Sequence, residues 1–155
     1  MLQKMELEWP EIKNKVTASL LKEEEPELCE ALWRKIETPA KLFCRHTLST
    51  GYVFMGEQRP PRHPVQAGTQ AVPLGRKEWL PSRIEPGSVI YSGVGGYGGI
   101  TVYYGPSTTP LRESGSPVAK VDRNQLDDLV RGGEYVFNAQ YMTHRPSIMI
   151  VRRVK

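Results

Sequence analysis

A glycine-rich segment between two short apolar runs limits the fold of this chain most strongly. The two runs are Ser88–Tyr91 and Ile100–Tyr104, and most of the residues between them are glycine. β-Branched and aromatic residues favour strands, while glycine adopts the positive φ angles that a tight reversal requires. The segment therefore predicts a β-hairpin, with Tyr97 near its tip and Tyr91 and Tyr104 on its strands.

This hairpin has two functional interpretations of equal weight. Main chain without side chains, next to several phenols, suits a pocket where a small molecule approaches the backbone. An exposed turn above core tyrosines fits the pattern as well. Gly93, Gly95 and Gly98 match the G-x-G-x-x-G dinucleotide fingerprint, but a strand pattern follows them where that fingerprint requires a helix. We therefore expect no nicotinamide or flavin cofactor.

Composition and charge favour a small, strand-rich protein. The chain has 155 residues, and its 14 glycines and 13 prolines disfavour long helices. We expect residues 1–155 to form a single domain. A net charge of +4 without a dense basic stripe argues against a nucleic-acid partner. The absence of a signal-like or membrane-length apolar run, and the unpatterned Cys29 and Cys44, predict a cytoplasmic protein without a membrane partner.

Positive charge is concentrated between two arginines in the first half of the chain. The charged residues of this stretch are Arg45, Arg59, Arg62, Arg76, Lys77 and Arg83, against Glu57 and Glu78. This excess either attracts an anionic small molecule, most simply a carboxylate, or forms a solvated surface. The irregular part of the stretch, Gln58–Arg83, is expected to pack as a loop over one mouth of the sheet.

Hydrophobic periodicity predicts the other elements. The strands are expected at Lys15–Leu21, Lys41–Gly51, Tyr52–Met55, Val118–Val121 and Ser147–Val154, after a lead-in at Glu6–Pro10. One helix begins at Pro26, a residue preferred at the first helical position, and ends near Glu37. A second is expected from about Asn124 to Tyr141, with Asp122 and Gln125 in capping-box register.

Alternation along the strand near residue 45 assigns its side chains to two faces. Phe43 and Arg45 share one face, and Cys44 and His46 share the other. His46 thus has apolar neighbours, and a satisfied core histidine is the alternative to a catalytic one. The order of elements predicts a mainly β fold with two helices: a small, closed, mostly antiparallel β-barrel capped by the helices.

Several motifs resemble known families. Glu25–Trp33 (E-P-E-L-C-E-A-L-W) and Val102–Gly105 (V-Y-Y-G) are similar to motifs of the cyclophilin-like small-barrel proteins of bacteria. Within that group, the motifs most similar to cucumopine and mikimopine synthases are Phe43–Gly51, Arg59–Pro64, Tyr97–Thr101 and Asn138–His144. The resemblance implies a cofactor-free opine enzyme that condenses histidine with 2-oxoglutarate in a Pictet–Spengler-type ring closure.

Such a condensation needs a base, proton donors and cations for the substrate carboxylates. The expected catalytic residues are Glu57, His46 and Tyr97, and the expected substrate-binding residues are Arg45, Lys77, Tyr91, Tyr104 and His144. Glu57 is the first choice for the base, although a surface carboxylate balancing nearby arginines is equally consistent. These phenols and cations are expected to open onto one shared hollow. The three histidines lack ligand spacing, so no metal is expected.

Two other functions compete with this one. The barrel is alternatively a binding module for a peptide or a small anion, or a hydrolase of a small amide. A binding module would show no turnover, which distinguishes it from an enzyme. An amide hydrolase would differ from a condensing enzyme in its reaction product. The expected partners are the small-molecule substrates, with assembly into a homo-oligomer left open.

Overall fold

Eight strands and two α-helices make up the described part of the protein. The computed structural model describes residues 2–47, 51–58, 84–91, 99–107 and 116–155. The strands are β1 (Lys4–Trp9), β2 (Asn14–Leu20), β3 (Ala40–His46), β4 (Gly51–Glu57), β5 (Ser88–Tyr91), β6 (Ile100–Ser107), β7 (Ser116–Val121) and β8 (Ser147–Arg153). The helices are α1 (Pro26–Lys35) and α2 (Leu126–Tyr141), and 3₁₀ turns cover Pro10–Ile12 and Arg123–Gln125.

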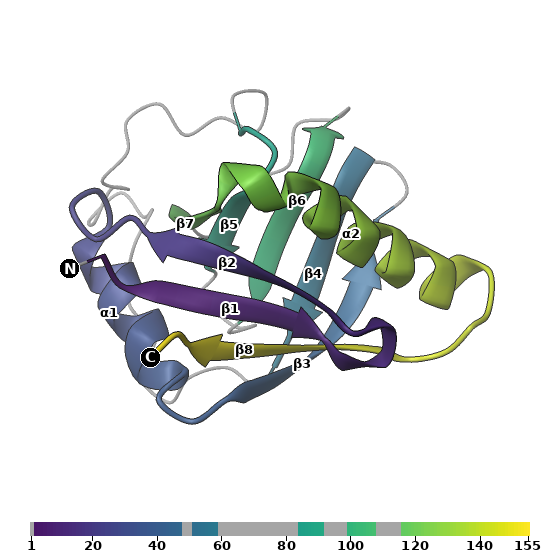
Figure 1. Ribbon diagram of the computed structural model, residues 1–155, viewed down its shortest axis with the longest axis horizontal. Helices are drawn as coiled ribbons and strands as arrows, with labels where there is room; N and C mark the ends of the chain where they lie inside the picture. The colour runs from purple at the N-terminus through teal and green to yellow at the C-terminus, as the bar shows by residue number, and fades with distance from the viewer. Residues whose placement is uncertain (1, 48–50, 59–83, 92–98, 108–115) are drawn as a thin grey trace, which may run out of the picture.

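The strands close into a barrel in the order β1-β2-β7-β5-β6-β4-β3-β8. All neighbouring strands pair antiparallel. Figure 1 shows α2 crossing in front of β6 and β4, and α1 at the left of the view beside both chain ends. The predicted mainly β architecture, a small closed antiparallel barrel with two helices, is confirmed. Because the barrel is closed, every described strand has a hydrogen-bonded neighbour on both sides, and no strand edge is left with unpaired backbone N–H and C=O groups.

The expected hairpin is present as β5 and β6. Val89 lies opposite Val102, and Tyr91 lies opposite Ile100. The tip of this hairpin, with Tyr97, lies outside the described residues, as does the predicted loop over residues 59–83. Its two strands therefore stand as the sequence predicts.

The first strand of the barrel corrects the sequence analysis, which treated Glu6–Pro10 as a lead-in. Met5, Leu7 and Trp9 are fully buried, while the residues between them are partly exposed. This alternation has the two-residue period of a strand with one buried face. β1 pairs with both β2 and β8, and so joins the first and last parts of the chain. The sequence prediction missed this strand because Glu6 and Glu8 place two charges within six residues.

The helices cover opposite ends of the barrel interior. Along β6, Ile100, Val102 and Tyr104 point inward and belong to the main buried cluster. Tyr91, opposite Ile100, lies beneath the Lys35 ammonium of α1, which is 5.8 Å from the ring centroid. Tyr104, four residues further along β6, packs against α2 at the other end. In the described ranges, neither helix is long and apolar enough to span a membrane.

Two glycines let α2 lie close to the barrel. A Cβ atom on Gly132 would lie 2.6 Å from the Trp9 ring, and one on Gly133 would lie 2.5 Å from the Tyr104 ring. Real Cβ atoms do not approach other atoms so closely. The glycines therefore cost some helix propensity, about 1 kcal/mol each, and allow aromatic packing in return.

The predicted capping box at the start of α2 does not form. The Asp122 carboxylate instead accepts a hydrogen bond from Lys4 Nζ at 3.1 Å, and the Gln125 side-chain oxygen accepts one from the Thr17 amide at 2.7 Å. A 3₁₀ turn at Arg123–Gln125 leads into the helix. Both side chains of the predicted capping box thus bind residues that lie more than 100 positions away in the sequence.

Candidate functional site

Strand pleating sorts the candidate residues into an inner and an outer set. The register aligns His46 with Phe54 and Val102 in one row and Arg45 with Met55 and Thr101 in the next. The three residues of the first row are buried, and His46 is the polar one among them. In the second row, Arg45 is exposed. The faces predicted for residues 43–46 are therefore the observed ones. Arg45 points out of the barrel and His46 points in.

An ion pair between Arg45 and Glu57 dominates the outer set. Arg45 Nε lies 2.9 Å and Nη2 lies 2.8 Å from the same carboxylate oxygen, Oε1 of Glu57. The Glu57 side chain is 37% exposed. No group among the described residues contacts its second oxygen, Oε2. Arg45 therefore orients the carboxylate through one oxygen, and within the described part of the chain the second oxygen is left to accept a proton.

Exposed apolar side chains adjoin this ion pair. Phe43 lies directly opposite Glu57 in the β3–β4 pairing and is 57% exposed, which is unusual for a phenylalanine. The Met55 sulfur lies 3.8 Å from Arg45 Nη2. Further along the same outer face, Val53 and Tyr103 are fully buried in a second apolar cluster. The outer face thus places an oriented carboxylate and a guanidinium beside an aromatic ring. We call Arg45, Glu57, Phe43 and Met55 the outer site.

His46 and Tyr104 form a buried pair on the inside. His46 Nδ1 lies 2.7 Å from the Thr47 carbonyl oxygen, and Nε2 lies 2.5 Å from the Tyr104 hydroxyl. A carbonyl only accepts, so Nδ1 carries the proton. Burial lowers the pKa of His46, against a smaller opposing effect of the Thr47 hydrogen bond. The ring is therefore neutral near pH 7, and the Tyr104 hydroxyl donates to Nε2.

The rest of α2 fixes His46 in place. The His46 amide donates to the Gln140 side-chain oxygen at 2.6 Å, and the Gln140 amide and the Tyr141 hydroxyl donate to the His46 carbonyl at 3.0 and 2.9 Å. Burial, with smaller contributions from Glu134 and Tyr52, raises the pKa of Tyr104 to about 12. The phenol therefore remains protonated and acts as a hydrogen-bond donor to the imidazole.

A pocket of about 530 Å³ opens above this inner pair, between the ends of β3, β4 and β6 and the helix α2. It is lined by His46, Thr47, Gly51, Tyr52, Tyr104, Glu134, Phe137 and Asn138. We call it the α2 pocket. Its walls are mostly aromatic, and its floor is the hydrogen-bonded pair of His46 and Tyr104.

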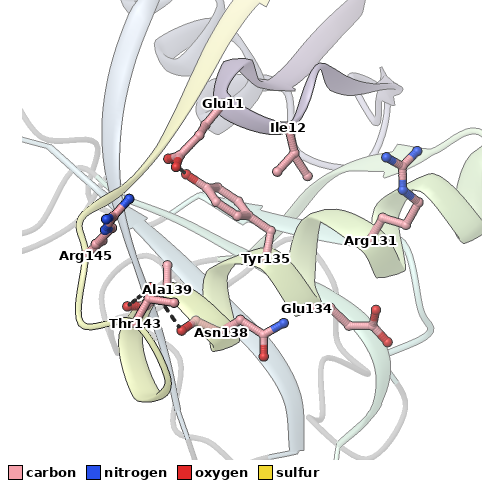
Figure 2. A pocket seen from close by; sticks show the side chains of 9 residues that line it. All are labelled: Glu11, Ile12, Arg131, Glu134, Tyr135, Asn138, Ala139, Thr143 and Arg145. Atoms are coloured by element: carbon pink, nitrogen blue, oxygen red, sulfur yellow. Dashed lines mark hydrogen bonds between the residues drawn. The ribbon is translucent and has the colours of Figure 1, made fainter.

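A second pocket of about 440 Å³ lies along α2 beside the Pro10–Ile12 turn (Figure 2). Tyr135 occupies its middle, where the hydroxyl donates to the Glu11 carboxylate. Arg131 and Arg145 lie at opposite ends of it. The two cations are therefore poorly arranged to hold one small anion, and the central phenol is already engaged.

The structure brings some of the predicted site residues together and separates others. Arg45 meets Glu57, and His46 meets Tyr104, but the pairs lie on opposite faces of the sheet. Tyr91 lies inside at the α1 end. The described phenols and Arg45 thus do not share one hollow.

Of the other three predicted residues, the structure describes only His144. His144 is exposed in the connection from α2 to β8, with a left-handed φ of 54°. Lys77 and Tyr97 lie outside the described residues.

The fold is shared with a protein of known structure. The structure of McbB in complex with tryptophan matches this chain with a TM-score of 0.75 and 26% sequence identity. The match covers 96% of this chain and 44% of the McbB chain, so this protein spans less than half the length of McbB. No family model and no curated protein matches the sequence. The barrel is therefore related to that of McbB, and the resemblance to cucumopine synthases stays a prediction.

Sequence reasoning missed several residues beside these sites. Phe43 stood in a quoted motif and on the correct face, yet its exposure became evident only with the barrel closed. Phe137 carried only the apolar spacing of a helix, and in the structure its ring packs edge-on against the His46 ring, with centroids 5.2 Å apart. Glu134 and Tyr52 carried no signal in the sequence, because only tertiary packing brings them to the α2 pocket.

Proposed function

We propose that the protein is an enzyme that joins an aromatic amino acid to a carbonyl compound by a Pictet–Spengler-type ring closure at the outer site. The observation that carries this proposal is the Glu57 carboxylate, which Arg45 holds by one oxygen while no other described residue forms a hydrogen bond or ion pair with its second oxygen. The similarity to McbB, whose structure contains tryptophan, supports an aromatic amino acid as one substrate.

The reaction has three stages with a defined proton balance. The amino group and the carbonyl carbon lose water to form an imine. A carbon of the aromatic ring then attacks the protonated imine, a C–C bond forms, and the C=N electron pair moves to nitrogen. The ring regains its aromaticity when a base removes the proton from the attacking carbon. Such a base typically contributes about 10²–10⁴-fold to the rate.

Glu57 is the proposed base. Its Oε2 atom accepts the ring proton, while the contacts from Arg45 fix the direction of the carboxylate. The exposed ring of Phe43 lies opposite Glu57 and offers a surface for the aromatic ring of the substrate. A base beside an apolar surface suits a substrate whose reactive carbon belongs to an aromatic ring.

Arg45 is the proposed binding partner of a substrate carboxylate. A guanidinium has five N–H donors, and the contacts with Glu57 use only Nε and Nη2. Among the described residues, nothing contacts Nη1. These remaining donors can bind a carboxylate alongside Glu57, as a keto acid requires.

The specific substrates proposed are histidine and 2-oxoglutarate. An imidazole carbon next to the side-chain attachment is the nucleophile, and the two carboxylates of 2-oxoglutarate suit the cationic stretch that includes Arg45 and Lys77. Tyr97 remains a proposed proton donor. Action without a cofactor, a cytoplasmic location and assembly into a homo-oligomer stay predictions.

Incubation with 2-oxoglutarate and either histidine or tryptophan tests the proposal. We expect a product whose mass equals the sum of the substrates less one water. The product should survive acid, which hydrolyses a simple imine. An amino acid deuterated at the reacting ring carbon should lose that deuterium.

Two results would count against the enzyme. If neither amino acid reacts faster than in buffer, the condensation is excluded. Saturable binding of either substrate without turnover would instead favour the binding module.

A further inference from the structure

We propose that the α2 pocket is a separate binding site for a small aromatic ammonium ion that carries no carboxylate. None of the outer-site residues lines this pocket, which lies on the inner side of the sheet. The inference therefore does not depend on the proposed reaction. It rests on the rings, the charge and the hydrogen-bond acceptors that the pocket presents.

Aromatic rings form most of the pocket wall. The rings of Tyr52 and Tyr104 meet edge to face with centroids 5.6 Å apart, and His46 meets Phe137 in the same way at 5.2 Å. All four of these rings line the pocket. The face of an aromatic ring carries negative potential, which attracts an organic cation. Tyr52 is 52% exposed although its ring is large, so the wall is accessible from solvent.

The charge of the lining also selects a cation. Glu134 is the charged residue among the described lining residues, which include no lysine or arginine. Figure 2 shows the Glu134 side chain pointing away from the contact between Tyr135 and Glu11. Glu134 lines both pockets, and its charge contributes to the raised pKa of Tyr104, which lines the α2 pocket. A negative charge at the rim attracts an ammonium group and repels a carboxylate.

Acceptor atoms complete the site. The Tyr104 hydroxyl uses its proton to bond His46 Nε2, so the lone pairs of its oxygen are available to an N–H donor. The Asn138 side chain adds an amide oxygen at the rim. Because His46 is neutral, no positive charge at the floor opposes an incoming ammonium group. An amine bonded to these oxygens would place an attached aromatic ring among Tyr52, Tyr104 and Phe137.

Calorimetric titration with three related probes tests the site. The probes are tyramine, tyrosine and 4-ethylphenol, which share a phenol ring and differ in the ammonium and carboxylate groups. We expect tyramine to bind roughly tenfold more tightly than either of the other two, as a desolvated cation–π contact and an added acidic partner require. Equal binding of tyramine and 4-ethylphenol would overturn the proposal, because the cation would then contribute nothing.

Two variants locate the binding. Glu134→Gln and Tyr52→Leu change partly or largely exposed side chains, and each should weaken tyramine binding by roughly threefold to tenfold. Asp127→Asn removes a charge from the same helix outside the pocket and should leave binding unchanged. If Asp127→Asn weakens binding as much as Glu134→Gln does, the effect is a general one of charge, and the proposed site is wrong.

The outer site supplies the remaining control. Glu57→Gln should leave tyramine binding unchanged even if it abolishes condensation. Loss of tyramine binding in Glu57→Gln would assign the amine to the outer site and contradict a separate pocket. If the wild-type protein binds tyramine but condenses no substrates, the pocket is supported and only the proposed reaction is contradicted.

Discussion

The backbone of Gly133 lies so close to Tyr104 that a Cβ atom there would come within 2.5 Å of the phenol ring. The Tyr104 hydroxyl in turn reaches His46 Nε2 at 2.5 Å. The missing side chain in α2 therefore sets the position of a hydrogen bond between two strands of the barrel. The helix, the phenol and the imidazole act as one packed unit at this end of the core.

Replacing Gly133 by alanine should destabilise the protein. Overpacking typically costs about 1–3 kcal/mol, and a contact of 2.5 Å with a buried ring belongs at the upper end of that range. Alanine restores about 1 kcal/mol of helix propensity, so we expect a net loss of about 2 kcal/mol. Urea unfolding measures this difference. Asp127→Ala, on the exposed side of the same helix, is the control and should cost only about 0.5 kcal/mol, since it removes one acidic side chain from the first helical turn. A Gly133→Ala protein as stable as that control would show that the Tyr104 ring shifts without cost.

The buried imidazole predicts how stability depends on pH. Burial lowers the pKa of His46 from its ordinary value of 6.5 in the folded state, so the unfolded state binds a proton first as pH falls. Stability should therefore decrease as pH falls through 6.5, until the folded pKa is reached, and stay unaffected by this group above 6.5. Protonation of His46 also places a proton on Nε2, which can then no longer accept the hydrogen bond from the Tyr104 hydroxyl.

Unfolding measured between pH 5 and pH 8 in two histidine variants checks this dependence. His46→Gln should flatten the pH profile, because it removes the group that titrates differently in the two states. His144→Gln alters an exposed histidine and should keep the wild-type profile. A profile that remains steep in His46→Gln would assign the pH dependence to other groups.

Local patterns in the sequence were sufficient for most elements of the barrel. Ser88–Tyr91 and Ile100–Tyr104 are β-branched and aromatic, and Pro26 opens a helix whose apolar residues recur every turn. These signals depend only on neighbours in the chain. The prediction missed β1 because the charged residues Glu6 and Glu8 hid the alternation of the buried residues in this strand. The capping box failed because its carboxylate binds Lys4, a contact that exists only after the barrel closes.

The candidate site could be predicted only in part for a related reason. Alternation alone turned Arg45 outward and His46 inward, as the structure has them. Alternation does not give the distance along a strand at which a partner lies. Tyr91 and Tyr104 both point inward, yet one lies beneath α1 and the other against α2. Partners across a barrel follow from register and closure, which a single sequence does not specify.

Glu57→Gln tests the proposed base. The amide keeps the shape of the carboxylate but cannot take up the ring proton, so kcat for condensation should fall by about 10²–10⁴-fold with little change in KM. Steady-state kinetics with product quantification measures this split. Glu30→Gln is a matched control, since Glu30 pairs with Arg34 at 3.0 Å on the surface of α1. An unchanged kcat in Glu57→Gln would remove Glu57 from the mechanism.

Arg45→Lys separates substrate binding from base positioning. Lysine keeps the charge but cannot contact Glu57 through two nitrogens and bind a carboxylate with the others. We expect KM for 2-oxoglutarate to rise roughly tenfold, as loss of a charged hydrogen bond predicts, and KM for a small aldehyde without a carboxylate to change little. Arg34→Lys, in the surface pair on α1, is the control and should match the wild type. Equal increases for both carbonyl substrates would mean that Arg45 orients Glu57 and does not bind the substrate carboxylate.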